Sequence, residues 1–383
     1  MRLRFGGIVL AALSLAACAT TPPPLPPAAS APAAPQPAPP AAPRPAELAF
    51  HNLPGWTEDD HAAAFRAFRA TCGAARSAQL AEVCRRARAE GELDDLHARA
   101  FFEANFRAEQ VGGDGMLTAY FAPEYPARSR PDGEFSAPVR ARPSDLVTID
   151  AGVFDPALAG VTGVALQTAN GVAPYPDRAT IEARPPEKAL AWMRPEDLFF
   201  LQIQGSGVLT FETGARMKAN FAGHNGRPFV GVATPMRDQG LLPPDGTSGE
   251  AIRSWLAANR GPQAEAIMRL NPRYVFFKLA PDDGAQPVGS AGVPLPPGRA
   301  IAVDPSRHAM GEIFWLDATA PSLTGAFPAY RRLAVALDTG GAIKGDARAD
   351  LYLGLGPQAG AEAGRVRHVL KMYRLTPRPE PQS

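Results

Sequence analysis

The sequence predicts a mainly β protein, with a closed β-barrel, an inserted second β domain and a small helical region at the start of the folded part. From Gly115 onward, short β-like runs are broken by Gly and Pro, and few helical patterns lie between them. Strands joined by turns rather than by crossover helices do not build a doubly wound parallel sheet. Apolar residues at helical spacing within residues 57–106 predict the helical region.

Composition sets the broad class of the protein. The 383 residues are enough for about two domains, at roughly 150 residues per domain. The hydrophobic share of 45% and the charged share of 20% are typical of a globular protein. A formal net charge of +1 lacks the basic excess that binding to many phosphates needs. We therefore expect no nucleic-acid partner.

Residues 1–18 are typical of an export signal. Arg2 and Arg4 precede the apolar run FGGIVLAALSL, which is too short to span a bilayer comfortably. The end of the segment, LAAC, resembles a bacterial lipobox, which implies cleavage before Cys18 and a lasting lipid anchor on that residue. Ala19 in place of Asp favours, by the same resemblance, the periplasmic face of a Gram-negative outer membrane. A secreted protein cut at Ala-x-Ala is the alternative.

Residues 19–47 form a Pro/Ala-rich linker. Half of residues 22–45 are proline and most of the others are alanine. Such a segment cannot bury a core and is expected to be an extended spacer of up to ~70 Å, at about 3.1 Å per residue. A tethered body of this kind suits an immobile substrate near the membrane.

Two cysteines follow the linker, Cys72 and Cys84. Because an exported protein meets an oxidising compartment, we expect a disulfide between them. A bridge over so short a loop stabilises by ~3 kcal/mol on the chain-entropy model. Two thiols alone make a poor metal site.

Three helices are expected before the barrel. The first lies within TEDDHAAAFRAFRATC, with Thr57 and Asp60 as a capping box. The second begins at Ser77 and the third ends near Phe106. The second helix is expected to bury one apolar face, made of Leu80, Val83, Cys84 and Ala87.

Six runs are expected to form strands: GMLTAYFAPEY (115–125), LFFLQIQGSGVLTF (198–211), RYVFFKL (273–279), RAIAVD (299–304), GEIFWLD (311–317) and RLAVALDTGG (332–341). The clearest helix among them is SGEAIRSWLAAN (248–259). No internal repeat of fixed period is present.

Several familiar sites are excluded by their residues. Asp338 begins an Asp-Thr-Gly turn like that of aspartic proteases, but those enzymes need two such turns to share one proton. Ser206 lies between glycines, yet Gln204 stands where the hydrolase elbow needs Gly. Lys344 is followed by Gly345, so there is no phosphate loop. The six histidines form no close pair, and we expect no metal and no cofactor.

Three aspartates remain, each at or near the end of an apolar run: Asp304, Asp338 and Asp350. A single one would be typical of a solvated turn or a cap. Three within one region favour chemistry, because a carboxyl group in an apolar wall has a raised pKa and can act as a general acid near neutral pH. Breaking a glycosidic bond requires such an acid.

Five segments resemble the membrane-bound lytic murein transglycosylase A family: residues 115–125, 200–207, 271–278, 298–316 and 338–364 (DTGGAIKGDARADLYLGLGPQAGAEAG). They occur in the family's order, over most of residues 54–375. The resemblance implies a double-psi β-barrel built from residues 48–124 and 274–383, with a second β domain inserted at 125–273. It also implies that the glycan lies in the groove between the two.

The resemblance assigns roles to matching residues. Asp350 corresponds to the family's acid and base, and Asp338 to its neighbour on the preceding strand, which orients and polarises the site. The implied substrate-binding residues are Thr118, Tyr120, Gln204 and Ser206. Asp304 and Lys344 are further candidates for substrate binding; Lys344 either lies near a peptide-stem carboxylate or is a solvated turn lysine. The family commonly has Thr-Gly-Tyr where this chain has Ala119 in the middle. Because alanine adopts positive φ less readily than glycine, this difference bears on where Thr118 lies.

The implied reaction cleaves the β-1,4 bond between N-acetylmuramic acid and N-acetylglucosamine and leaves 1,6-anhydromuramic acid ends. One aspartate suffices, because the C6 hydroxyl of the substrate is the nucleophile. We expect a peptidoglycan lytic exotransglycosylase, although the residues do not separate attack at chain ends from attack within chains. The alternative is a non-catalytic peptidoglycan-binding lipoprotein, against which the intact motif around Asp350 argues. Expected partners are glycan strands, the membrane through the lipid anchor, and cell-wall synthesis or division complexes; the oligomeric state is left open.

Overall fold

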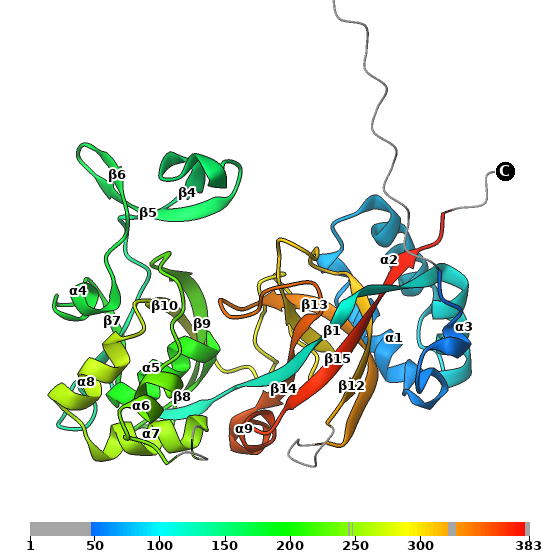
Figure 1. Cartoon of the computed structure of the whole chain (residues 1–383). Helices are drawn as coiled ribbons and strands as arrows, with labels where there is room; N and C mark the ends of the chain where they lie inside the picture. The colour runs from blue at the N-terminus through cyan, green and yellow to red at the C-terminus, as the bar shows by residue number, and fades with distance from the viewer. Residues whose placement is uncertain (1–46, 244–245, 247, 321–326, 380–383) are drawn as a thin grey trace, which may run out of the picture. The chain divides into compact units, whose positions relative to one another are not determined.

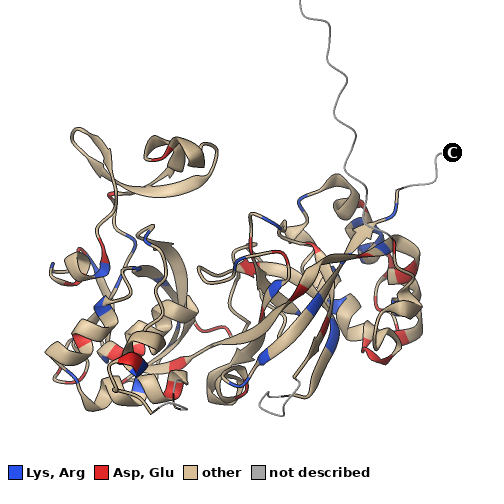
Figure 2. Ribbon diagram, viewed as in Figure 1, with Lys and Arg blue, Asp and Glu red and all other residues tan. Residues whose placement is uncertain are grey.

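The computed structural model describes residues 47–243, 246, 248–320 and 327–379 (Figure 1). The export signal, Cys18 and the linker up to residue 46 lie outside the described residues, so those expectations stay predictions. Within the described residues, no helix has the length and apolar character needed to cross a membrane. Figure 2 shows acidic and basic residues mixed along the chain, in keeping with the net charge of +1.

The N-terminal helices are α1 (His61–Ala70), α2 (Ala78–Glu90) and α3 (Asp95–Asn105), with short 3-10 helices at Phe50–Asn52, Trp56–Glu58 and Cys72–Ala74. The prediction of a Thr57–Asp60 capping box is wrong, because Thr57 belongs to the 3-10 turn before the helix. Asp60 is itself the N-cap and accepts from the Ala63 N–H at 2.7 Å. Cys72 and Cys84 are joined by a disulfide that ties the end of α1 to α2.

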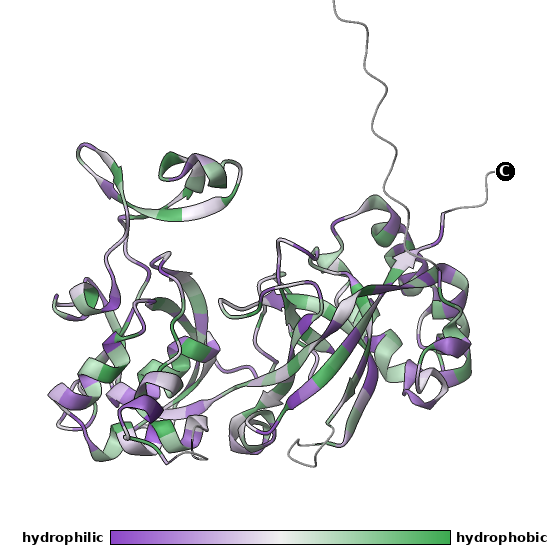
Figure 3. Ribbon diagram, viewed as in Figure 1, coloured by the Kyte–Doolittle hydropathy of each residue, from purple (hydrophilic) through white to green (hydrophobic). Residues whose placement is uncertain are grey.

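Ser77 is the N-cap of α2, as the sequence predicts, and accepts from the Leu80 N–H at 3.1 Å. The predicted buried face of α2 is confirmed. These helices pack onto one end of the barrel in a shared apolar cluster that includes Phe65, Phe102 and Trp315. Figure 3 shows the hydrophobic residues along these helices and the barrel strands.

The barrel is closed and six-stranded, which confirms the mainly β prediction. Its strands lie in the order β1 (Phe106–Ala122), β14 (Arg348–Leu355), β11 (Ala300–Val303), β13 (Ala329–Thr339), β12 (Ile313–Thr319) and β15 (Arg367–Pro377). The pairs β1–β14 and β11–β13 are parallel, and the other neighbours are antiparallel. Helix α9 (Gly356–Ala363) joins β14 to β15. Leu117, Ile301, Phe314, Leu351 and Met372 fill the barrel core.

The inserted part contains a four-stranded sheet, in the order β10 (Val275–Pro281), β9 (Arg216–His224), β8 (Gly207–Phe211) and β2 (Glu124–Ala127). A two-stranded sheet pairs β3 (Ala137–Arg140) with β7 (Ala189–Met193), and a three-stranded sheet joins β4 (Leu146–Asp150), β5 (Thr162–Thr168) and β6 (Gly171–Ala173). Its helices are α4 (Arg178–Glu182), α5 (Pro195–Gln204), α6 (Ala233–Asp238), α7 (Gly249–Ala258) and α8 (Pro262–Arg269), with 3-10 turns at Ala151–Val153 and Pro156–Leu158. Helix α7 was predicted.

The run at residues 198–211 was expected to be a strand, and this prediction is wrong for its first half. Residues up to Gln204 belong to α5, which begins with Pro195 in its first turn and has Glu196 and Asp197 at its positive end. Gly205 ends the helix with φ 83°, and the strand β8 begins only at residue 207. The signals for the start of the helix, Pro195 to Asp197, lie before the apolar run, which is why the run alone favoured a strand.

The domain boundaries predicted from the sequence stay a proposal, with one adjustment. Strand β10 pairs with β9 in the four-stranded sheet rather than with a barrel strand. We therefore propose that the inserted domain continues to Pro281, beyond the boundary expected at residue 273. The first boundary, near residue 124, falls where β1 of the barrel gives way to β2 of the inserted sheet.

Candidate active site

The alternation of strand β14 determines where Asp350 points. Its neighbours Ala349 and Leu351 are fully buried in the barrel core. Because successive side chains of a strand point to opposite faces, Asp350 faces out of the barrel. It is partly exposed there, on the face that the inserted domain shares.

Four strands bring the site residues into one row. In the parallel pair β1–β14, Thr118 lies opposite Asp350, and across the other edge of β14, Ala302 of β11 lies opposite Asp350. Ala302 in turn pairs with Asp338 of β13. The two aspartates are thus two strand steps apart, or about 10 Å between their Cα atoms. Ala302, the residue between them, has a side chain of a single methyl group.

Asp350 has one carboxylate oxygen engaged by the protein. The Thr118 hydroxyl donates to Oδ1, and Nη2 of Arg348 donates to the same hydroxyl at 2.9 Å. No described residue donates to Oδ2. Burial is the largest effect on the pKa of Asp350 and raises it; the charge of Asp338 raises it further. The Thr118 hydrogen bond and the Arg348 charge lower the pKa, but less, so that it lies above the ordinary 3.8.

Asp338 is engaged on both oxygens. Oδ1 accepts from the Ser290 N–H at 3.0 Å, the Ser290 hydroxyl at 2.7 Å and the Thr339 N–H at 2.9 Å. Oδ2 accepts from the Tyr120 hydroxyl at 2.8 Å. Burial and the neighbouring Asp338 raise the pKa of Tyr120 well above 10, so Tyr120 remains a donor. Asp338 is therefore fixed in place, whereas Asp350 keeps a free oxygen.

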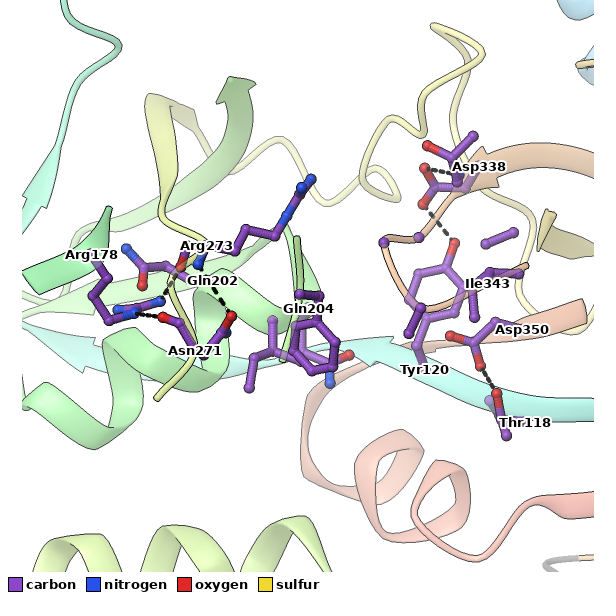
Figure 4. Close-up of a pocket in the computed structure, with 18 residues that line it drawn as sticks. Thr118, Tyr120, Arg178, Gln202, Gln204, Asn271, Arg273, Asp338, Ile343 and Asp350 are labelled. Atoms are coloured by element: carbon purple, nitrogen blue, oxygen red, sulfur yellow. Dashed lines mark hydrogen bonds between the residues drawn. The ribbon is translucent and has the colours of Figure 1, made fainter. Parts of the chain in front are cut away.

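Both carboxylates line one pocket of about 870 Å³, counting the space at its open mouth (Figure 4). Barrel residues form one wall, and the end of β13 with the turn after it (residues 339–343) contributes to that wall. Residues of the inserted domain form the other wall: Arg178, Gln202, Ile203, Gln204, Phe229, Asn271 and Arg273. A pocket of this shape, with a protonatable acid on one wall and amides and arginines on the other, suits a polar polymer with many hydroxyl and amide groups.

Two family models match the chain. Residues 116–278 match the MltA specific insert domain, and residues 299–376 match the 3D domain. The chain is 30% identical over 279 residues to membrane-bound lytic murein transglycosylase A of Vibrio cholerae, which covers 70% of this chain and 68% of the relative. The chain belongs to the membrane-bound lytic murein transglycosylase A family.

Solved structures of family members agree with this assignment. The membrane-bound lytic murein transglycosylase of Agrobacterium tumefaciens superposes with a TM-score of 0.75 at 34% identity, over 86% of this chain and 97% of that chain. The Escherichia coli MltA structure with bound chitohexaose gives a TM-score of 0.58 at 27% identity, over 79% and 83% of the chains. The predicted double-psi β-barrel with an inserted domain is thus the fold of this transglycosylase A family member.

The structure brings together five of the residues that the sequence singled out. Thr118, Tyr120, Gln204, Asp338 and Asp350 all line the pocket. The side-chain oxygen of Gln204 also accepts from the backbone N–H of Phe121 at 3.4 Å, which links α5 to β1. The role of each residue in binding glycan stays a proposal.

Three other residues lie outside the pocket lining: Ser206, Asp304 and Lys344. Asp304 is buried and accepts from Ser306 and from the Gly345 N–H at 2.9 Å, so it fastens the end of the turn that follows β13. Burial raises the pKa of Asp304, but these hydrogen bonds and the nearby Lys344 outweigh it and lower the pKa to about 2. The Lys344 ammonium lies 3.5 Å from Asp304 rather than in the pocket.

Ala119 lies in a regular part of β1. The register with β14 is unbroken from Met116 to Tyr120, and the irregularity begins between Tyr120 and Ala122. Alanine at this position is therefore compatible with Thr118 facing Asp350, and the hydrogen bond between them forms.

The sequence reasoning missed Arg348, Ser290 and the arginines of the inserted wall. Arg348 stands two residues before Asp350 on one strand, so period-two alternation could have placed it on the same face. Arg273 lies in the NPRYVFFK segment, whose resemblance to the family implies no role for this arginine. Among the described residues, no group of His, Cys, Asp and Glu has the arrangement of a metal site.

Proposed function

We propose that this lytic murein transglycosylase cleaves the β-1,4 bond between N-acetylmuramic acid and N-acetylglucosamine in peptidoglycan and closes 1,6-anhydromuramic acid ends, with Asp350 as acid and then base. One observation carries the proposal: Asp350 has a raised pKa and an unengaged Oδ2 in the pocket, whereas both oxygens of Asp338 are occupied. The family names support the substrate, because the relatives are lytic murein transglycosylases.

The first step needs a protonated carboxyl group. Asp350 donates its proton from Oδ2 to the glycosidic oxygen, the bond from C1 of the muramyl sugar to that oxygen breaks, and the ring develops oxocarbenium character. The Asp338 carboxylate and its fixed donors contribute a preorganised electrostatic environment for the developing positive charge.

The second step uses the same group in its other form. The ionised Asp350 accepts the proton of the C6 hydroxyl while that oxygen bonds to C1. The enzyme is returned to its protonated state, and no water is consumed. Because the nucleophile belongs to the substrate, the site needs no second free carboxylate, in contrast to ordinary glycosidases.

The pocket walls would hold the glycan. The complex of Escherichia coli MltA with chitohexaose supports a β-1,4-linked amino-sugar chain as the kind of ligand that this fold binds. Thr118 and Tyr120 of the barrel and Gln204 of α5 line the pocket, which supports a role for them in binding the glycan. We also propose that the chain is membrane-associated, as the relatives' names describe for those proteins, through a lipid on Cys18 at the periplasmic face of the outer membrane.

The test compares three full-length proteins purified in detergent and incubated with peptidoglycan: wild type, Asp350→Asn and the control Asp346→Asn. Asp346 is an exposed aspartate in the preceding turn that pairs with Arg307 at 3.3 Å and does not line the pocket. Products are separated and weighed by mass spectrometry. We expect wild type and the control to release muropeptides one water lighter than hydrolysis products, and Asp350→Asn to be slower by about 10²- to 10⁴-fold.

Two results would contradict the proposal. If wild type binds the glycan and releases nothing, the protein is a peptidoglycan-binding module. Reducing ends that contain the added water would instead indicate hydrolysis, in which case water and not the C6 hydroxyl is the nucleophile.

A further inference from the structure

Arg273 lies on the inserted wall of the pocket, on a backbone segment that its neighbours hold firmly. Arg178 is buried and donates from Nε to the carbonyl of Asn271 at 2.9 Å and from Nη2 to the carbonyl of Arg273 at 2.7 Å. The side-chain oxygen of Asn271 accepts from the Arg273 N–H at 3.2 Å. Asn225 adds a hydrogen bond to the carbonyl of Pro272 at 2.9 Å. The base of the Arg273 side chain is therefore preorganised.

The guanidinium of Arg273 is only partly satisfied. Of its five N–H donors, Nη1 contacts the carbonyl of Arg227 at 3.2 Å, and no carboxylate of a described residue lies within 4 Å. Burial lowers the pKa of Arg273, and no neighbouring anion offsets that effect. Arg178 provides the contrast, since its guanidinium pairs with Glu182 at 3.2 Å. A desolvated cation that faces a pocket without an anion is costly unless a ligand supplies the anion.

The guanidinium of Arg273 also lies beside the turn between β13 and β14. A side-chain carbon added at Gly341 would lie 3.9 Å from Cζ and Nε of Arg273 and 3.4 Å from Cβ of Phe229. Figure 4 shows the Arg273 side chain extending away from Arg178 and Asn271 into the open space of the pocket. Arg273 and Asp350 therefore line the same pocket.

The charge in this pocket is not supplied by the residue that the sequence suggested. Lys344 is directed to Asp304 and does not line the pocket. Arg178 does line it, but each of its three guanidinium nitrogens already donates to a backbone carbonyl or to Glu182. Among the described lining residues, Arg273 is the cation with two guanidinium nitrogens, Nε and Nη2, that donate to no described protein group.

We propose that Arg273 binds a carboxylate on the C3 substituent of the muramyl sugar, either the lactyl carboxylate itself or a carboxylate of the stem peptide attached to it. This inference rests on the proposed function. N-acetylglucosamine and N-acetylmuramic acid differ only at C3, where the muramyl sugar carries the lactyl ether. A guanidinium matches a carboxylate with two parallel hydrogen bonds, and this geometry fixes position as well as affinity.

The consequence is control over which glycosidic bond of the glycan strand lies at Asp350. An alternating glycan has two kinds of β-1,4 bond, and a chain shifted by one sugar would present the wrong one to Asp350. The carboxylate occurs on every second sugar, so its pairing with Arg273 admits one register. The sugars of chitin-type chains carry no carboxylate, so Arg273 would not distinguish one register of such a chain from the next. Arg273 thereby determines specificity and positions substrate, without taking part in proton transfer.

The test uses the full-length protein in detergent as wild type, Arg273→Gln, Arg273→Lys and the matched control Arg142→Gln. Arg142 is exposed, donates to the carbonyls of Ala222 and Leu146 in the same inserted domain, and does not line the pocket. Four ligands are compared: glycan strands with stem peptides, strands stripped by an amidase to leave the free lactyl carboxylate, stripped strands converted to the neutral methylamide, and chitohexaose. KM and kcat are measured for the strands and Kd for chitohexaose, at low and high salt.

For Arg273→Gln, we expect KM for the carboxylate-bearing strands to rise about tenfold to hundredfold, the loss of one charge-assisted pair. Salt should raise the KM of wild type and leave that of the variant nearly unchanged. Arg273→Lys should recover part of the affinity, and Arg142→Gln should resemble wild type. If the KM of Arg273→Gln rises with peptide-bearing strands alone, the stem peptide supplies the carboxylate. If it also rises with stripped strands, the lactyl group supplies it.

The inference is overturned if Arg273→Gln weakens the binding of methylamide strands or of chitohexaose as much as the binding of the acidic strands, because that pattern indicates a structural role. It is also overturned if no KM changes. Failure of the proposed function gives a different result, since wild type itself would then not cleave any strand.

Discussion

The hydrogen bond from Thr118 to Asp350 allows a sharp test of how the acid is positioned. Thr118→Val removes one hydroxyl and keeps the β-branched shape that suits strand β1, so no cavity forms. The change leaves Asp350 without its donor and Nη2 of Arg348 without its acceptor. A hydrogen bond to a charged group contributes about 1.5–3 kcal/mol. At 1.36 kcal/mol per factor of ten, we expect kcat to fall about tenfold to hundredfold.

The variant should also change the pH dependence in a defined direction. In the proposed mechanism the first step requires protonated Asp350, so activity is expected below the pKa of that group and is lost as the pH rises through it. The Thr118 hydrogen bond lowers this pKa. Without it the pKa rises, and the alkaline limb of kcat/KM moves to higher pH. The maximum falls while the range of active pH extends upward.

The assay measures the release of anhydro-muropeptides from peptidoglycan across pH for wild type, Thr118→Val and Thr118→Ser. The serine variant restores a hydroxyl and should recover most of the activity and the position of the limb. Circular dichroism and thermal melting check that all three proteins are folded. A valine variant with full activity and an unmoved alkaline limb would refute the view that Thr118 orients Asp350.

Two further predictions concern stability. Asp304→Asn should lower the free energy of unfolding by about 2 kcal/mol at pH 7, because the pKa of Asp304 in the folded state, about 2, lies below the ordinary 3.8. This contribution to stability is present above pH 4 and is lost as the pH falls through 2. The urea unfolding midpoints of wild type and variant should therefore converge in acid. Equal midpoints at pH 7 would contradict it. Arg299→Met should lower the free energy of unfolding in urea by about 3–5 kcal/mol, because it leaves the buried carboxylate of Asp59 without the guanidinium that donates to it at 2.7 and 2.8 Å. A loss below about 1 kcal/mol would show that Asp59 finds other partners.

The strands and their facing residues could be predicted because they depend on short-range pattern. A continuous apolar run leads into Asp338, and around Asp350 the polar residues Arg348 and Asp350 alternate with Ala349 and Leu351, so the strands and the outward direction of Asp350 follow from the sequence. Helix α5 was missed for a local reason as well: its start at Pro195 lies before the run predicted to be a strand, and its end at Gly205 falls in the middle of that run.

The division of roles between the two aspartates could not be predicted from the pattern. It depends on Ser290, which is 48 residues before Asp338, and on Tyr120, which is 218 residues before it. The same limit applies to Arg273, whose backbone is held by Arg178 from 95 residues away. Such contacts are set by tertiary packing, and one sequence contains no local signal for them.

A single group that acts as acid and then as base, as we propose for Asp350, has opposing requirements, and the surroundings of Asp350 meet both. To donate a proton near neutral pH the carboxyl group needs a raised pKa, and burial at the barrel wall supplies it. To survive as a carboxylate until the C6 hydroxyl attacks, it needs donors, and Thr118 with Arg348 behind it supplies them on one oxygen. Because that hydrogen bond occupies Oδ1 alone, Oδ2 stays free for the proton that moves. An arginine placed directly on Asp350 would bind the carboxylate too firmly, so the threonine between them is what keeps one group usable in both steps.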